Sequence, residues 1–142
     1  MILIVDSNIV ISSLIRDSTT RSILINTPFI LYAPETMINE IRKYEDYILK
    51  KSGLTKSDFE RLFDLVSENI NILEKEKYEK HLEEADKIIG HVHKGDVPFV
   101  ALALAITNDG IWTDDKDFER QNRIKIWKTK DILNLINISK ED

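Results

Sequence analysis

The chain begins Met1-Ile2-Leu3-Ile4-Val5-Asp6, and this stretch is the strongest indication of its fold class. The unbroken aliphatic run Ile2 to Val5 is typical of a strand that is buried on both faces, as strands of parallel sheets are. An acidic side chain follows the run directly. Because loops at the ends of such strands carry the chemistry of α/β proteins, Asp6 is the first candidate for a functional residue.

Similar apolar runs alternate with helical patterns along the rest of the chain. The predicted strands are Ile2–Val5, Phe29–Ala33, Ile70–Leu73, Gly110–Thr113 and Arg123–Trp127. The predicted helices are Ser7–Ile15, Ser18–Asn26, Glu35 to about Lys51, Thr55–Val66, Lys75–Ile89 with a break near His81, Val97–Thr107 and Lys130–Ile136. This alternation favours an α/β fold, with a parallel sheet of about five strands between two layers of helices.

Two of these helices have informative patterns. The long helix that starts after Pro34 has an apolar face, which we expect to be made by Met37, Ile38, Ile41, Tyr44 and Ile48. The segment from Val97 to Thr107 is apolar all round, which indicates a central, buried helix.

Length and composition limit the class of protein. With 142 residues, 42% of them hydrophobic, the chain is expected to form one domain over residues 1–138, with 139–142 as a frayed tail. It has no cysteine, which excludes disulfides, thiolate zinc sites and a cysteine nucleophile and fits a reducing compartment. No signal peptide is visible, and no stretch approaches the ~20 apolar residues of a membrane span, so we expect a cytoplasmic protein without membrane contact.

The charge distribution is uneven. The net charge of −5 counts against a simple polyanion binder, because nucleic-acid-binding domains usually carry a basic footprint. Cations bound at an acidic site would cancel part of that charge. Basic residues are concentrated near the C-terminus, at Lys116, Arg120, Arg123, Lys125, Lys128 and Lys130.

Acidic residues beside the predicted elements indicate a divalent-metal site. Carboxyl ends of parallel strands meet at one edge of a sheet, so acids in the adjoining loops are expected to converge. Mg²⁺ and Mn²⁺ are hard cations that prefer carboxylate oxygens and water, and such a cation holds together acids that would otherwise repel one another. The acids in suitable places are Asp6, Glu40, Asp96, Asp115 and Asp117.

Each acid also has a simpler interpretation. Asp6 and Asp96 precede predicted helices and could cap them, although one carboxylate can cap a helix and still bind a metal with its other oxygen. Glu40 could be a solvated residue of its helix. The acids of the loop from Asp114 to Asp117 could likewise be solvated.

Other catalytic patterns do not fit the sequence. A dinucleotide or P-loop site needs closely spaced glycines, and the four glycines are scattered. A serine hydrolase needs a nucleophile elbow, which is absent. A phosphatase of the Asp-x-Asp type would need an aspartate where Asn8 stands. We interpret the histidines as surface residues or as neighbours of the ligands rather than as zinc ligands: His81, His91 and His93.

Four segments resemble the motifs of the PIN domain family in their family order. They are Val5-Asp6-Ser7-Asn8 with Ser12, Pro34 to Ile41, Gly95 to Ala105, and Trp112 to Phe118. The PIN domain is the nuclease fold of VapC-type toxins and of several RNA-processing enzymes. The resemblance implies a PIN-like three-layer sandwich and an acidic pocket that binds Mg²⁺ or Mn²⁺ and hydrolyses RNA.

The resemblance also implies roles for individual residues. The implied metal-binding and catalytic acids are Asp6, Glu40, Asp96 and Asp115, with Asp117 as an auxiliary acid. Asp114 falls in a variable position, and the polar residues that orient the acids are Asn8 and Thr113. Relatives often have a further acid shortly before the third motif, where this chain has His91-Val92-His93-Lys94-Gly95, a departure that bears on metal affinity.

Together with this resemblance, these residues predict a metal-dependent endoribonuclease that hydrolyses phosphodiesters with metal-activated water. Asp6, Asp96 and Asp115 would hold the principal ion, with Glu40 and Asp117 holding a second ion or its waters. The candidates for gripping RNA phosphates are Lys116, Arg120 and Arg123.

The biological role has several interpretations. One is a VapC-type toxin with a protein antitoxin as partner, and another is an RNA-processing nuclease. A third, of a different class, is a catalytically idle PIN-like module for RNA binding or assembly. Because many relatives pair so that two acidic pockets share one groove, we also expect a homodimer.

Overall fold

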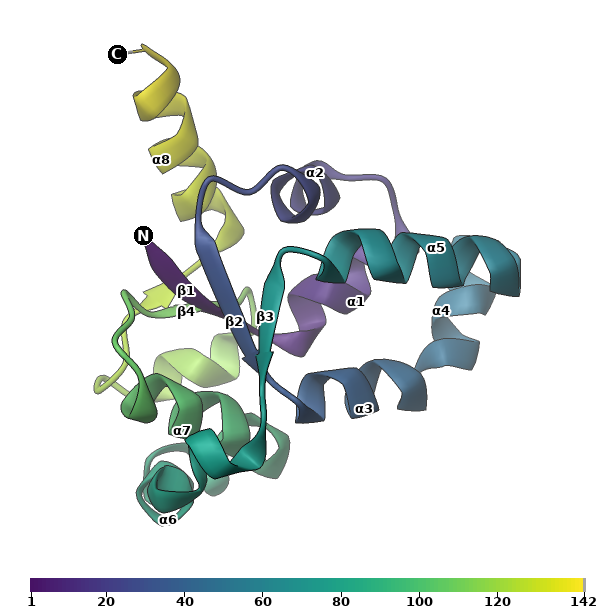
Figure 1. Cartoon of the computed structure of the whole chain (residues 1–142). Coiled ribbons are helices and arrows are strands. Elements are labelled where there is room, and N and C mark those ends of the chain that lie inside the picture. Colours follow the sequence, from purple (N-terminus) through teal and green to yellow (C-terminus); the bar gives the residue numbers. More distant parts are fainter. Residues whose placement is uncertain (142) are drawn as a thin grey trace.

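The chain folds around a five-stranded sheet in which each strand runs parallel to its neighbours (Figure 1). This computed structural model describes the backbone of residues 1–141 and the side chains of residues 1–137. The strand order is β3-β2-β1-β4-β5. The bounds are β1 Ile2–Val5, β2 Ile30–Pro34, β3 Ile70–Leu73, β4 Ile111–Trp112 and β5 Ile126–Trp127. The predicted α/β class and parallel sheet are confirmed.

Helices connect and cover the strands. They are α1 Ser7–Ile15, α2 Thr19–Ile25, α3 Thr36–Lys43, α4 Glu45–Ser52, α5 Lys56–Ser67, α6 Leu82–Ala85, α7 Val97–Ala105 and α8 Thr129–Glu141. Short turns of tighter or wider helix are η1 Lys75–Lys77, η2 Glu79–His81, η3 Asp86–Gly90, η4 Lys94–Asp96 and η5 Lys116–Arg120.

The helices form two layers because the chain crosses the sheet in two directions. From β1 it proceeds to β2 and β3, and helices α1 to α5 of these connections pack on one another (Figure 1). It then returns to β4 on the other side of β1, and α7 of this connection packs against β1 and β2. Right-handed crossovers made in opposite directions put their helices on opposite faces of a sheet.

The core lies between these layers. Leu3, Ile4 and Val5 of β1 are fully buried, as expected of a central strand. Nearly all of α7 from Val97 to Ala103 is buried as well, which confirms that it is a central helix. Its alanines, such as Ala101, allow it to lie close to the sheet.

The long helix predicted from Glu35 to about Lys51 is in fact two helices. The helix is interrupted at Tyr44, whose φ of −97° and ψ of 10° are not helical. The break lets both halves bury an apolar residue against the body of the protein, since Ile41 of α3 and Ile48 of α4 are both fully buried. A straight helix of that length would extend for roughly 25 Å and carry its second half away.

Two other segments also differ in detail from their predictions. Lys75–Ile89 forms the short pieces η1, η2, α6 and η3, and one boundary lies at His81, where we expected a break. The helix α8 continues to Glu141, beyond the predicted domain limit at residue 138. The single domain over residues 1–138 and the frayed tail over 139–142 stay predictions, and Asp142 lies outside the described residues.

Hydropathy also bears on the helices. Within the described part of the chain, none of them combines the length and apolar character that a membrane crossing requires.

Candidate metal centre

The acidic residues gather where the chain changes direction across the sheet. The strand β1 lies between β2, which follows it in the chain, and β4, which comes much later. The loops that leave the carboxyl ends of β1 and β4 therefore diverge, and α/β sheets bind ligands in the crevice that results. Asp6 follows β1, and Thr113 and Asp115 follow β4.

A cavity of about 230 Å³ opens at this place. Four of the predicted acids line it, namely Asp6, Glu40, Asp96 and Asp115. The remaining wall is made by Asn8, Ile11, Tyr44, Tyr47 and His93. Residues of α1, α3 and α4 and of the segments that follow β1, precede α7 and follow β4 are thus brought together from across the sequence. Their catalytic and metal-binding roles stay predictions.

A tighter cluster includes the fifth predicted acid. Asp96, Asp115 and Asp117 each offer a carboxylate oxygen, and these three oxygens lie within 4.8 Å of one another. An ion that binds oxygens at ~2.0–2.6 Å brings its ligands to within roughly 4–5 Å of each other, so the spacing suits one ion. Among the described residues, this is the group of acids that meets that spacing, whereas the sequence grouped Asp6 with Asp96 and Asp115.

Thr113 links the acids through hydrogen bonds. Its hydroxyl donates to Oδ2 of Asp6 at 2.8 Å, and the same Oγ1 accepts the backbone N–H of Asp115 at 3.0 Å. Oδ1 of Asp115 in turn accepts the backbone N–H of Asp117 at 2.9 Å. Since Thr113 is fully buried, this chain of bonds holds the loop after β4 at a fixed position against Asp6.

Asp114, in the variable position of the motif, forms hydrogen bonds to Thr129. Its carboxylate accepts the backbone N–H of Thr129 at 2.8 Å and the Thr129 hydroxyl at 2.6 Å. It therefore ties the loop after β4 to the start of α8 and leaves Asp115 to face the cavity.

The helix-capping interpretation is wrong for both Asp6 and Asp96. Within the described residues, neither side chain accepts a hydrogen bond from the first turn of the helix that follows it. Asp6 bonds Thr113 instead. The backbone of Asp96 is already helical, with φ −82° and ψ −15°, and a capping residue needs an extended conformation to turn its oxygen back.

One oxygen of Asp96 lacks any partner that would offset its burial. Oδ2 of Asp96 is buried and receives no hydrogen bond from the described part of the chain. Leaving a buried acceptor unpaired costs ~1–3 kcal/mol, and more if the group is charged. A cation at the cluster would satisfy this oxygen, so the site fits a metal with oxygen ligands.

Burial also shifts the proton affinities of these acids. Loss of hydration, reinforced by neighbouring carboxylates, raises the pKa of Asp6 to about 7, although the Thr113 hydrogen bond opposes the shift. Loss of hydration likewise raises the pKa of Asp96 to about 6, with His93 opposing. Burial raises the pKa of Glu40 as well. Without a cation, the site therefore resists full ionisation near neutral pH.

His93 is a neighbour of the acids. Its Nδ1 lies 3.6 Å from Oδ1 of Asp96, and its ring is exposed on the cavity rim. Gly95 makes room for the ring, because a Cβ at this position would lie 2.7 Å from Cε1 of His93. His91 is exposed, in keeping with a surface histidine.

The predicted phosphate contacts are not among the residues that line the cavity in the described structure. Lys116 and Arg120 are exposed on η5, next in the chain to Asp115. Arg123 donates to Glu84 of α6 at 2.8 Å. Its charge is therefore already partnered within the protein.

The aromatic wall of the cavity was missed by the sequence analysis. We assigned Tyr44 to the apolar core face of its helix, but it is 45% exposed, and Tyr47 is 51% exposed. A signal was present: Glu40, Tyr44 and Tyr47 are spaced by four and then three residues, a spacing that would place them on one side of the continuous helix predicted here.

Comparisons with known proteins agree with this geometry. A family model described as the PIN domain matches residues 4–136. A search among curated proteins returned no match. The matched range includes the end of β1, every strand after it and all five acids of the site. The fold is of the nuclease type, and the chain belongs to the PIN domain family.

Proposed function

We propose that this protein is a Mg²⁺- or Mn²⁺-dependent endoribonuclease. The observation that carries the proposal is the cluster of Asp96, Asp115 and Asp117, with the buried and unpartnered Oδ2 of Asp96. Oxygen ligands select hard cations of this kind. The chain has no cysteine that could offer softer ligands or a thiolate nucleophile.

Each acid has its own task in this mechanism. Asp96, Asp115 and Asp117 would hold the principal ion, and Asp6 and Glu40 would bind a second ion or its waters. When bound, the cation supplies Lewis acidity that lowers the pKa of water and neutralises charge on the phosphate. Thr113 keeps Asp6 and the loop of Asp115 in register, so the carboxylates need little rearrangement.

The sequence suggests a different assignment of the acids to the metal ions, in which Asp6, Asp96 and Asp115 hold the principal ion and Asp117 is auxiliary. The two assignments predict different rankings. If Asp117 is a ligand of the principal ion, Asp117→Asn should weaken Mn²⁺ binding as much as Asp115→Asn does. If it is auxiliary, Asp6→Asn should weaken binding more than Asp117→Asn.

RNA would enter from the side of η5. Lys116 and Arg120 are exposed next to the acids and suit contacts with phosphates flanking the scissile bond. Arg123 would first have to leave Glu84, so we expect it to contribute least of the three. Asn8 lines the cavity and is suited to orienting a bound phosphate or water.

The quaternary structure and role belong to the same proposal. A two-fold homodimer would combine two sparse basic surfaces into one RNA track, which would offset the net charge of −5. Light scattering that gives a mass near 16.5 kDa at all accessible concentrations would reject the dimer. A VapC-type toxin in the cytoplasm should copurify with an antitoxin encoded beside it, whereas an RNA-processing nuclease should not.

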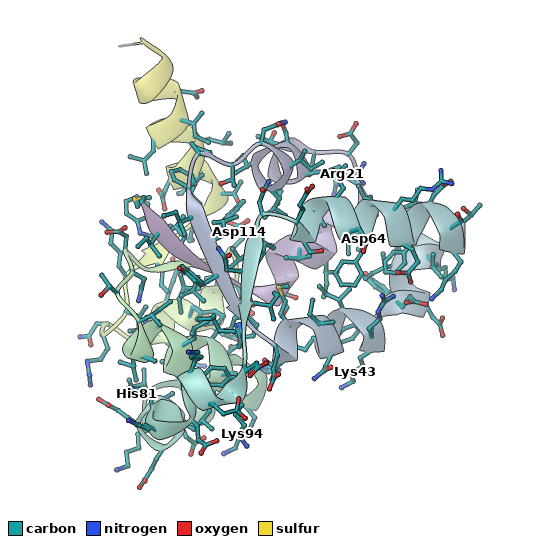
Figure 2. The ribbon with its side chains drawn as sticks, viewed as in Figure 1. Arg21, Lys43, Asp64, His81, Lys94 and Asp114 are labelled. Carbon is teal, nitrogen blue, oxygen red and sulfur yellow. The ribbon has the colours of Figure 1, made fainter. Side chains whose placement is uncertain are left out.

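The test of the activity is cleavage of a labelled RNA. The wild-type protein should cleave in Mg²⁺ or Mn²⁺ and stop in excess chelator, and Asp96→Asn should abolish cleavage. Asp64→Asn is the matched control, because Asp64 is an exposed acid that projects from α5 (Figure 2). Cleavage that persists unchanged in chelator, or RNA binding without any metal-dependent cleavage, would reject the proposal; the latter would indicate an idle module.

A further inference from the structure

Two exposed tyrosines form one wall of the acidic cavity. Tyr44 and Tyr47 line it together with Asp6, Glu40 and Asp115. About half of each tyrosine is accessible to solvent, at 45% and 51%. Aromatic rings that are open to solvent beside a candidate catalytic site are available to a ligand, since the protein itself leaves much of their surface uncovered.

The fold fixes the position of these rings. The chain turns at Tyr44, between α3 and α4, and the turn is held from outside by Arg42. Its guanidinium donates to Glu45 at 2.7 Å and to Glu60 of α5 at 3.0 Å, and it lies 4.9 Å from the centre of the Phe63 ring. The tyrosines therefore lie at a turn between two helices that the contacts of Arg42 hold in place, rather than on a free loop.

A lysine accompanies each ring. Nζ of Lys43 lies 5.7 Å from the ring centre of Tyr44, and Nζ of Lys51 lies 5.9 Å from that of Tyr47. Both lysines are exposed, and Lys43 projects from α3 (Figure 2). Each lysine nitrogen lies over its ring, and such a pair matches a nucleotide: the exposed lysine can pair with the phosphate while the base stacks on the ring.

The lysines also offset an electrostatic difficulty. The carboxylates of the cavity repel a polyanion, and the predicted phosphate contacts Lys116 and Arg120 lie outside the cavity wall in the described structure. Lys43 and Lys51 do not line the cavity either, but they lie next to the two tyrosines that do, and this positive charge provides attraction beside the cavity wall. It does so from α3 and α4, a different part of the fold from η5.

We propose that Tyr44 and Tyr47 are a stacking platform for unpaired nucleobases, with Lys43 and Lys51 contacting the adjoining phosphates. The platform selects single-stranded RNA, because bases within a duplex are stacked on one another and do not present their faces. This inference deepens the proposed nuclease function and rests on it for the position of the scissile phosphate. Binding to the platform itself does not require cleavage.

The first test measures binding without cleavage. A fluorescently labelled single-stranded oligoribonucleotide is titrated with Asp96→Asn protein, which keeps the platform. Adding Tyr44→Leu or Tyr47→Leu should weaken binding about tenfold each, since stacking on an aromatic ring is lost while apolar bulk is kept. The corresponding Phe variants should bind as the parent does, and affinity for a duplex of the same sequence should be weak and unchanged.

Matched controls separate stacking from general surface effects. Leu65→Ala removes another exposed apolar side chain, on α5, and should leave binding unchanged. Lys51→Gln should weaken binding and reduce its salt dependence, whereas Lys50→Gln, its neighbour on α4, should have a smaller effect. Circular dichroism of each variant verifies the fold.

The outcomes distinguish this inference from the nuclease proposal. Metal-dependent cleavage with no loss of single-strand affinity in the Leu variants would overturn the platform alone. Loss of affinity in the Leu but not the Phe variants, in a protein that never cleaves, would keep the platform and reject the nuclease. Three results would overturn the platform. The Leu and Phe variants could lose the same affinity for single-stranded RNA, or the Leu variants could lose as much affinity for the duplex. The Leu variants could also keep their affinity for RNA and lose the binding of a protein that copurifies with the wild type.

Discussion

The molecule has two clusters of charged side chains that are built in opposite ways. The acid site gathers like charges and is largely buried, with Asp6 and Asp96 only 3% and 7% exposed. The corner between α3 and α4 gathers opposite charges at the surface, where Arg42, Lys56 and two glutamates are linked by ion pairs. The first arrangement opposes folding, whereas the second favours it.

Their proton affinities show the same contrast. Burial raises the pKa of Asp6 to about 7. At the corner, the hydrogen bond from Arg42 lowers the pKa of Glu60 to about 2. A protein keeps an unfavourable cluster of like charges where a ligand relieves it, so the difference points to the acid site as the place of binding. The corner supports the helices that carry Tyr44 and Tyr47.

The largest expected effect is on cleavage. Asp6→Asn should reduce metal-dependent RNA cleavage by at least ~10²-fold, because a charge that stabilises the reacting groups is lost. Its amide oxygen can still accept the Thr113 hydrogen bond, so the fold should persist. Glu60→Gln removes a carboxylate from the other cluster and should change cleavage less than about twofold. Equal losses in both variants would contradict the contrast.

The next effect is on how the free energy of unfolding of wild type and Asp6→Asn depends on pH. It is measured by urea unfolding with a chelator present, so that no metal is bound. The folded pKa of Asp6, about 7, lies above its ordinary value of 3.8, so the folded state binds the extra proton between these values. The contribution of Asp6 is therefore favourable at low pH and is lost as pH rises toward 7. The free energy of unfolding of Asp6→Asn should rise relative to that of wild type by roughly 3 kcal/mol between about pH 5 and about pH 8.

Glu60 supplies the comparison with opposite sign. Its folded pKa, about 2, lies below its ordinary value of 4.5, so its contribution is present near neutral pH and is lost as pH falls between these values. Glu60→Gln should therefore lower the melting temperature slightly at neutral pH and not at about pH 2. A gap between Asp6→Asn and wild type that does not grow with pH would show that the carboxyl of Asp6 is not destabilised by burial.

A third effect is stabilisation by metal. Mn²⁺ at a hundred times its dissociation constant should raise the free energy of unfolding of wild type by ~2.7 kcal/mol at about pH 8. The gain should shrink at about pH 5, because protons compete for Asp6 and Asp96. Asp96→Asn should lose most of the gain, and Glu60→Gln should retain it. Equal gains in all three proteins would place the ion elsewhere.

The sequence predicts the fold and the acids well because both depend on local patterns. The run Ile2–Val5 identifies a buried strand, and Asp6 and Asp115 are identified by their places after strands. The break at Tyr44 could not be predicted, since it is held by Arg42 bonding Glu60, which lies 18 residues away in the sequence. Partners distant in sequence leave no periodic signal.

The capping alternative for Asp6 and Asp96 proved wrong for a similar reason. Whether Asp96 caps α7 depends on the backbone conformation of Asp96. This residue is the last of the turn η4, so its backbone is already helical before α7 begins. For Asp6 the deciding contact is Thr113, which is 107 residues away. The closeness of Asp117 to Asp96 likewise follows from the path of the loop after β4, which residue types alone do not fix.

The smallest expected effect concerns the exposed cluster and salt. Arg42→Gln removes the ion pairs that link α3, α4 and α5, yet exposed pairs contribute little to stability, so the melting temperature should fall only slightly. In about 1 M NaCl the gap between variant and wild type should narrow, because salt screens surface charges. The Mn²⁺-dependent gain in stability should change little, since Asp96, Asp115 and Asp117, which would hold the principal ion, do not lie on α3 or α4. A gap that stays constant at high salt would mean that Arg42 holds the corner through its packing on Phe63 rather than through its charge.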